Sequence, residues 1–137
     1  MADAPRHGRG LLDTSVVIHL EHIAVDDLPV EVAISAVTMA ELTAGPHATS
    51  DSDERARRQD RLPGTEAAFD PLPFTVEEAR AYGRVFAATA AAGRKPRGPR
   101  VVDILIAATA LAESLPLYTR NADDVSHLAG LVEVISV

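Results

Sequence analysis

Short β-rich segments alternate with helical segments along this 137-residue sequence, and this alternation restricts the fold more than any other feature. The β-rich segments are residues 11–12, 32–37, 117–119 and 131–137, and each of the first three is followed by a helical pattern or a helix start. Strands and helices that alternate in a short chain favour a parallel sheet covered by helices on both faces. We therefore predict a three-layer α/β/α sandwich with a mainly parallel sheet, formed as a single domain by residues 11–137 behind a loose N-terminal arm of residues 1–10.

The composition excludes several classes of protein. The sequence contains no cysteine, so zinc-thiolate sites, cysteine nucleophiles and disulfide scaffolds are ruled out. The longest apolar runs, such as residues 104–112, are far shorter than the roughly 20 residues that a membrane span needs, and no signal-peptide pattern follows Met1. We therefore expect a cytoplasmic protein with no membrane partner.

Three carboxylates lie inside apolar segments, where an unpaired charge costs several kcal/mol. They are Asp13, Glu41 and Asp103. Each has an ordinary structural interpretation, because Asp13 and Asp103 can cap helices and residues 38–41 fit a capping box. Taken singly, these interpretations are as good as a functional one.

The positions of the acids relative to the strands favour a functional site. Asp13 follows the first strand, and Glu41 lies one helical turn after the second. Asn121, Asp123 and Asp124 follow the strand that ends at residue 119. All these positions fall at the carboxyl edge of a parallel sheet, where ligands bind. We expect the acids to converge there.

Asp103 is expected to reach the same edge from the start of a helix. It shares a helix face with Ala107 and Ala110, small residues that let the helix lie close to the sheet. Carboxylates held together repel one another, and a hard divalent cation with oxygen ligands removes that repulsion. Mg²⁺ or Mn²⁺ suits such a site, and the chemistry that it implies is metal-assisted hydrolysis of a phosphodiester.

Four segments of the sequence resemble the four motifs of PIN domains, and most closely those of the VapC ribonuclease toxins of bacterial toxin-antitoxin pairs. The segments are residues 11–18 (LLDTSVVI), 34–42 (ISAVTMAEL), 102–110 (VDILIAATA) and 117–121 (LYTRN). The resemblance implies that Asp13, Glu41 and Asp103 bind the metal and that Thr14 or Ser15 supplies a hydroxyl near the first acid. It also implies an Mg²⁺- or Mn²⁺-dependent endoribonuclease that acts on RNA, forms a homodimer and is inhibited by a VapB-like antitoxin that blocks the acidic pocket.

The sequence departs from the family pattern at Asn121, where the family often has an aspartate. Asp124 matches a further family aspartate three residues later. An asparagine offers a carbonyl oxygen but no charge, so a second metal site is in question. Either Asp124 supplies the missing acid, or the site works with fewer charged ligands.

Two other functions compete with the nuclease. A catalytically degenerate PIN-fold binding module would keep the fold and the antitoxin contact without turnover, and Asn121 gives that idea some weight. A phosphoacceptor receiver-like signalling domain also places an aspartate at a strand end. It normally needs a lysine near the end of a later strand, however, and the only lysine of this chain is Lys95, in a loop.

The net charge of −7 argues against a nucleic-acid footprint over the whole surface, but a local one is compatible with it. The cations gather in two clusters: Arg55, Arg57, Arg58 and Arg61 in a charged helical segment, and Arg94, Lys95, Arg97 and Arg100 in a loop. Each cluster is ordinarily interpreted as solvated surface. Because the loop directly precedes Asp103, we expect its four cations to bind RNA phosphates, with the helical cluster as the second choice.

Overall fold

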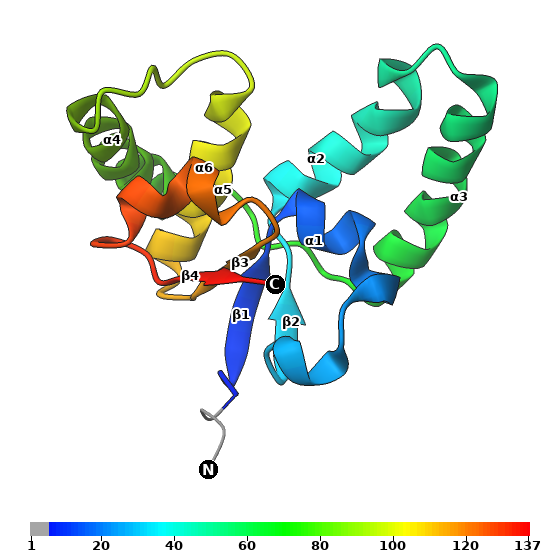
Figure 1. Cartoon of the computed structure of the whole chain (residues 1–137), viewed down its shortest axis with the longest axis horizontal. Helices are drawn as coiled ribbons and strands as arrows, with labels where there is room; N and C mark the ends of the chain where they lie inside the picture. Colours follow the sequence, from blue (N-terminus) through cyan, green and yellow to red (C-terminus); the bar gives the residue numbers. More distant parts are fainter. Residues whose placement is uncertain (1–5) are drawn as a thin grey trace.

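Four short parallel strands form the centre of the molecule (Figure 1). They are β1 (Arg9–Leu12), β2 (Glu31–Ala33), β3 (Leu117–Thr119) and β4 (Val134–Ser136), arranged in the order β2-β1-β3-β4. The coordinates are a computed structural model that describes residues 6–137. Every pair of neighbouring strands is parallel, as the sequence predicts.

Six α-helices surround the sheet. Successive residues of a strand point to opposite faces, so each face has its own core. Leu11 packs in the core that includes α4 and α5, whereas its neighbour Leu12 packs in the core that includes α1 and α2. The three-layer α/β/α prediction is therefore confirmed. The helices are α1 (Thr14–Ile18), α2 (Ala36–Ala44), α3 (Ser52–Ala68), α4 (Val76–Ala91), α5 (Arg100–Ala112) and α6 (Ala122–Val125).

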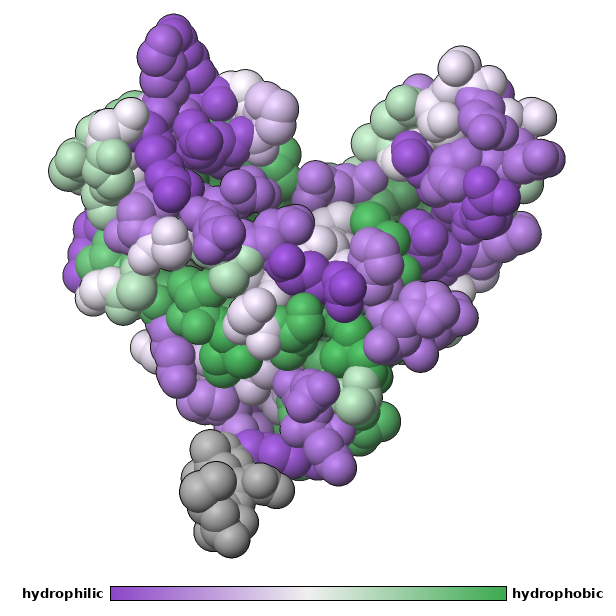
Figure 2. All heavy atoms as spheres, viewed as in Figure 1, coloured by the Kyte–Doolittle hydropathy of each residue, from purple (hydrophilic) through white to green (hydrophobic). Residues whose placement is uncertain are grey.

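The helices project beyond the carboxyl edge of the sheet as two lobes (Figure 1). One lobe contains α2 and α3, and the other contains α4, α5 and α6. Figure 2 shows hydrophilic surface over both lobes and a hollow between them. In the described part of the chain, no helix combines the length and the apolar character needed to cross a membrane.

Helix α3 continues through Pro63, although a proline ordinarily interrupts a helix. A proline inside a helix removes one N–H donor and crowds the carbonyl four residues earlier. Both Gln59 and Pro63 are exposed, so water can bond to the carbonyl of Gln59. The helix therefore tolerates a residue that would end a buried one.

The N-terminal segment is held more firmly than predicted for residues 1–10, of which residues 1–5 lie outside the described part. The Arg6 guanidinium donates to the carbonyls of Val25 and Leu28 at 3.1 and 3.0 Å. Strand β1 already begins at Arg9, two residues earlier than expected. Gly10 is required there, because a Cβ atom would lie 2.4 Å from Cε1 of Tyr118. Residues 9 and 10 therefore belong to the sheet.

A capping box at the start of α4 includes a buried carboxylate. The Thr75 amide donates to Oε2 of Glu78 at 3.1 Å, and the Thr75 hydroxyl bonds to the same oxygen. Glu78 is only 1% exposed. Although burial opposes it, hydrogen bonds from Thr75 and Glu113 lower the pKa of Glu78. The same hydrogen bond to Glu78, together with burial, raises the pKa of Glu113.

We predict that Glu113→Gln raises the melting temperature at pH 7.5 and changes it little at pH 4.5. The folded pKa of Glu113 lies above its ordinary value of 4.5, so its contribution to stability is complete below that pH and is lost as the pH rises. A glutamine keeps a donor toward Glu78 without adding charge. Thermal melts from pH 4.5 to 8 test this, with the exposed Glu66→Gln as control. A lower melting temperature for Glu113→Gln at pH 7.5 would contradict it.

Candidate active site

Asp13 lies at the carboxyl end of β1 and caps α1 at the same time. Its amide donates to the carbonyl of Tyr118 at 3.0 Å, which ties the end of β1 to β3. Its Oδ1 atom accepts the amide of Val16 at 3.1 Å and the hydroxyl of Ser15 at 2.5 Å. Oδ2 accepts no hydrogen bond from residues 6–137, so one carboxylate oxygen remains available to a ligand.

Glu41 lies inside α2 and does not form the capping box that its sequence position allows. The helix is capped by Ser35, whose hydroxyl accepts the amide of Thr38 at 3.0 Å. Glu41 instead accepts a hydrogen bond from the hydroxyl of Thr14, which also lies 3.2 Å from Oγ1 of Thr38. Ser35 and Thr38 are fully buried, so these hydroxyls hold Glu41 in a fixed place.

Ser35 and Thr38 are missing from the sequence-based site. Their spacing, Ser-x-x-Thr before an apolar helix, is the signal of an N-cap and could have located the start of α2. The contact with Thr14 has no such local signal, because Thr14 and Thr38 are 24 residues apart.

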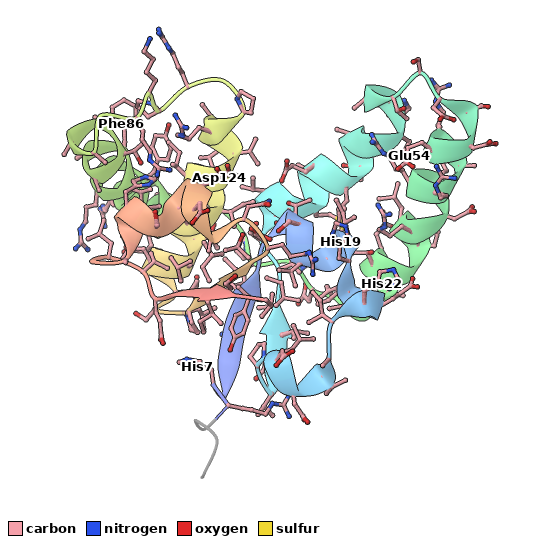
Figure 3. The ribbon with its side chains drawn as sticks, in the orientation of Figure 1. His7, His19, His22, Glu54, Phe86 and Asp124 are labelled. Atoms are coloured by element: carbon pink, nitrogen blue, oxygen red, sulfur yellow. The ribbon has the colours of Figure 1, made fainter. Side chains whose placement is uncertain are left out.

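Asp103 stands in the first turn of α5, and Pro99, not Asp103, is the N-cap of that helix. Burial raises the pKa of Asp103 to about 6, with further contributions from the negative charges of Asp124, Asp13 and Glu41, while Arg100 opposes the shift. Asp124 comes from α6 and lies on the lobe that also carries α5 (Figure 3). The negative charges of Asp124, Asp13 and Glu41, which come from separate parts of the chain, therefore all act on Asp103.

Asn121 and the two acids after it are arranged differently from one another. Asn121 is exposed at the start of α6, and its backbone amide donates to Oγ1 of Thr119 at 2.9 Å. Asp124 lines a pocket with Asp103, whereas Asp123 does not contribute to that pocket. Asp124 is therefore the acid that this segment presents to Asp103.

The donor set suits a hard divalent cation, because it consists of carboxylate, hydroxyl and amide oxygens without sulfur or imidazole. Among residues 6–137, no three Asp, Glu or His side chains are already grouped closely enough to hold one ion. Binding would require the carboxylates to draw closer together. The raised pKa of Asp103 supports the fit, because a cation would relieve the repulsion that contributes to it.

The four loop cations have different environments. Nη1 of Arg94 donates to the backbone carbonyls of Asp123 and Asp124 at 3.0 Å each, so Arg94 holds α6 in place. Arg97 and Arg100 line the pocket beside Asp103 and Asp124, which has a volume of about 260 Å³. Lys95 is exposed outside that pocket. The structure therefore brings Arg97 and Arg100 to the acids, while the guanidinium of Arg94 is already bonded to protein.

We predict that Asp103→Asn melts no lower than the parent at pH 7.5 in EDTA. The folded pKa of about 6 exceeds the ordinary value of 3.8, so the contribution of Asp103 to stability is complete near pH 4 and is lost as the pH rises through 6. The melting temperature of the metal-free parent should fall over that range more than that of the variant. Asp123→Asn is the control, and a clear drop for Asp103→Asn at pH 7.5 would show that this carboxylate stabilises the fold.

The chain is similar over most of its length to known nucleases. Residues 10–131 match the PIN domain family. The chain is 38% identical over 133 residues to ribonuclease VapC5 of Mycobacterium tuberculosis. This match covers 93% of this chain and 95% of the relative. It is 42% identical over 104 residues to ribonuclease VapC8 of the same organism, covering 75% of this chain and 91% of the relative.

A solved structure gives the same result. The crystal structure of VapBC-5, a member of the VapBC family of toxin-antitoxin systems from Mycobacterium tuberculosis, matches with a TM-score of 0.78 at 36% identity. The match covers 95% of this chain and 99% of that chain. By family, sequence and fold, the chain therefore belongs to the PIN domains, among the VapC ribonucleases.

Proposed function

We propose that this VapC ribonuclease hydrolyses RNA at the sheet edge where Asp13, Glu41, Asp103 and Asp124 meet, with Mg²⁺ or Mn²⁺ as cofactor. The observation that carries the proposal is the convergence of these acids, expressed in the influence of the other three on the pKa of Asp103. Acidic side chains from separate elements are brought to one sheet edge at a cost in repulsion, which is typical of sites that bind a cation.

The residues of the site have distinct tasks in this proposal. Asp13, Asp103 and Glu41 would hold the cation, which when bound lowers the pKa of a water and offsets charge on the phosphodiester. Ser15 orients Asp13, because its hydroxyl donates to Oδ1 at 2.5 Å and accepts the Arg120 amide at 3.1 Å. Thr14 orients Glu41 by the hydrogen bond described above. Held in these orientations, the acids would position a water molecule for attack on the phosphorus atom.

Asp124 supplies the charge that Asn121 does not bring. Its carboxylate is the strongest of the three charged neighbours that raise the pKa of Asp103, whereas Asn121 is exposed. Asn121 would orient a water through its amide group. The experiments below distinguish this nuclease from a degenerate PIN-fold module that binds without cleaving.

We also propose that the chain is the toxin of a type II toxin-antitoxin pair. A VapB-like antitoxin would cover the acidic pocket, and the toxin would act as a homodimer in the cytoplasm, where both RNA and the antitoxin are made. The support comes from VapBC-5, a member of the VapBC family of toxin-antitoxin systems. The matched chain of that structure is 36% identical to this chain.

Asp13→Asn and Asp103→Asn should each reduce metal-dependent cleavage of single-stranded RNA more than about 100-fold, because several kcal/mol of charge stabilisation are lost. Circular dichroism should show an unchanged fold, and Asp123→Asn is the control. Full activity of the parent in EDTA would refute the metal site. No cleavage by the parent with either ion would favour the degenerate module.

Asp124→Ala should impair cleavage more than Asp123→Ala, since only Asp124 lines the pocket beside Asp103. Asn121→Asp should lower the Mg²⁺ concentration that gives half the maximal rate, because it adds one negative charge near the site. Rates measured over a Mg²⁺ titration test both effects. Near-parental activity for both alanine variants would mean that Asp13, Glu41 and Asp103 suffice.

Co-expression with the small protein encoded beside the gene should yield a stable complex without ribonuclease activity. Antitoxin removal under denaturing conditions, followed by refolding of the chain, should restore cleavage. A free chain that never binds the neighbouring product would contradict the toxin assignment but not the nuclease.

A further inference from the structure

Three of the four arginines of α3 are already bonded to protein groups. Arg55 donates to two backbone carbonyls of the segment before the helix, at 2.9 and 3.1 Å. Arg57 and Arg58 pair with the carboxylate of Glu54 at 2.7 and 3.0 Å, and Arg58 also donates to the carbonyl of the residue after α2, at 2.8 Å. Within residues 6–137, the guanidinium of Arg61 makes no hydrogen bond or ion pair, although the residue is partly buried.

Arg61 lies beside the acidic site. It lines a pocket of about 270 Å³ together with Thr14, Glu41, Glu54 and Arg58. Arg58 and Glu54 neutralise each other, and the carboxylate of Glu41 accepts the hydroxyl of Thr14. Arg61 is therefore the cation of this pocket that has no partner among the described residues.

A matching group of cations stands on the other lobe. Arg97 and Arg100 line the pocket with Asp103 and Asp124, and Nη1 of Arg100 also donates to the carbonyl of Lys95 at 3.1 Å. Glu54, on α3, and Asp124, on α6, mark the two lobes on either side of the intervening hollow (Figures 2 and 3). The acids thus lie between one arginine on the α3 lobe and two on the opposite lobe.

We propose that Arg61 binds a backbone phosphate of the RNA substrate, on the opposite side of the scissile bond from Arg97 and Arg100. An arginine guanidinium matches the geometry of phosphate oxygens with paired hydrogen bonds, and a partly buried one without a partner is suited to an anion. Contacts on both sides of the acids also offset their repulsion of a polyanion. This inference rests on the proposed ribonuclease function and adds the direction of the strand, across the hollow from lobe to lobe.

The substrate class follows from this arrangement. A single strand that spans both lobes would contact Arg61 and Arg97 together, whereas a dinucleotide has no phosphate besides the scissile one to offer to either arginine. We therefore infer that the enzyme acts on single-stranded stretches of several nucleotides and gains its affinity from phosphates remote from the cleaved bond.

The test measures binding of a fluorescent twelve-nucleotide single-stranded RNA to the full chain in the Asp103→Asn background, over a range of NaCl concentrations. Arg61→Gln should weaken binding several-fold and lower the slope of log K against log salt by about 0.7, the share of one phosphate on a single strand. Arg61→Lys should keep the slope, because it keeps the charge. Arg57→Gln, on the same helix but exposed and paired with Glu54, should change neither quantity.

Kinetics of the chain with intact acids give a second readout. Arg61→Gln should raise KM for the long RNA with little change in kcat, and should leave cleavage of a dinucleotide unaffected. A parental salt slope in Arg61→Gln, or an equal loss on both substrates, overturns the proposal. The same is true if Arg61→Gln weakens only the complex with the antitoxin, since Arg61 then contacts protein. A parent that binds no RNA overturns the proposed function as well, whereas an active parent with an unaffected Arg61→Gln overturns this inference alone.

Discussion

Carboxylates at one edge of the parallel sheet repel one another, and the packing of the rest of the structure has to counterbalance that repulsion. This repulsion contributes to the pKa of Asp103, which burial first, and then the negative charges of three other acids, raise to about 6. The acids cannot move apart easily, since β1 is paired on both sides and α5 is anchored by a buried face that includes Ile104 and Ala107. Packing on the two faces of the sheet therefore holds together charges that would separate in solution.

Neutral groups hold these acids in place, and this preserves the negative charge of the site. The hydroxyls of Ser15 and Thr14 orient Asp13 and Glu41, and neither carboxylate forms an ion pair among residues 6–137. Arg94 bonds to the backbone carbonyls of α6, not to the carboxylate of Asp124. A guanidinium paired with that carboxylate would fix its position equally well but would weaken its attraction for a divalent cation. The hydrogen bonds thus fix the orientation of the carboxylates without neutralising their negative charge.

An acidic chain that acts on a polyanion needs cations that are not bonded within the protein. With a net charge of −7, the protein has little general attraction for RNA, so binding depends on where unpaired arginines lie. In the described chain, ion pairs and backbone carbonyls take up most of the α3 arginines and Arg94. Arg61 and Arg97 line pockets beside the acids without such a bond, and they stand on opposite lobes.

The sequence by itself determined the layered parallel fold and the position of Asp13 at the carboxyl end of the first strand. Strand and helix patterns and caps are local, and parallel strands have their carboxyl ends on the same side. It did not determine that α3 passes through Pro63, that residues 6–10 are held, or which partner each long side chain takes. Only the tertiary structure decided that Thr14 bonds to Glu41, 27 residues away, and that Arg94 bonds to the carbonyl of Asp124, 30 residues away. These partners depend on how elements that are far apart in the sequence pack together. The local periodicity of the sequence therefore does not predict which arginines have a hydrogen-bond partner in the folded protein.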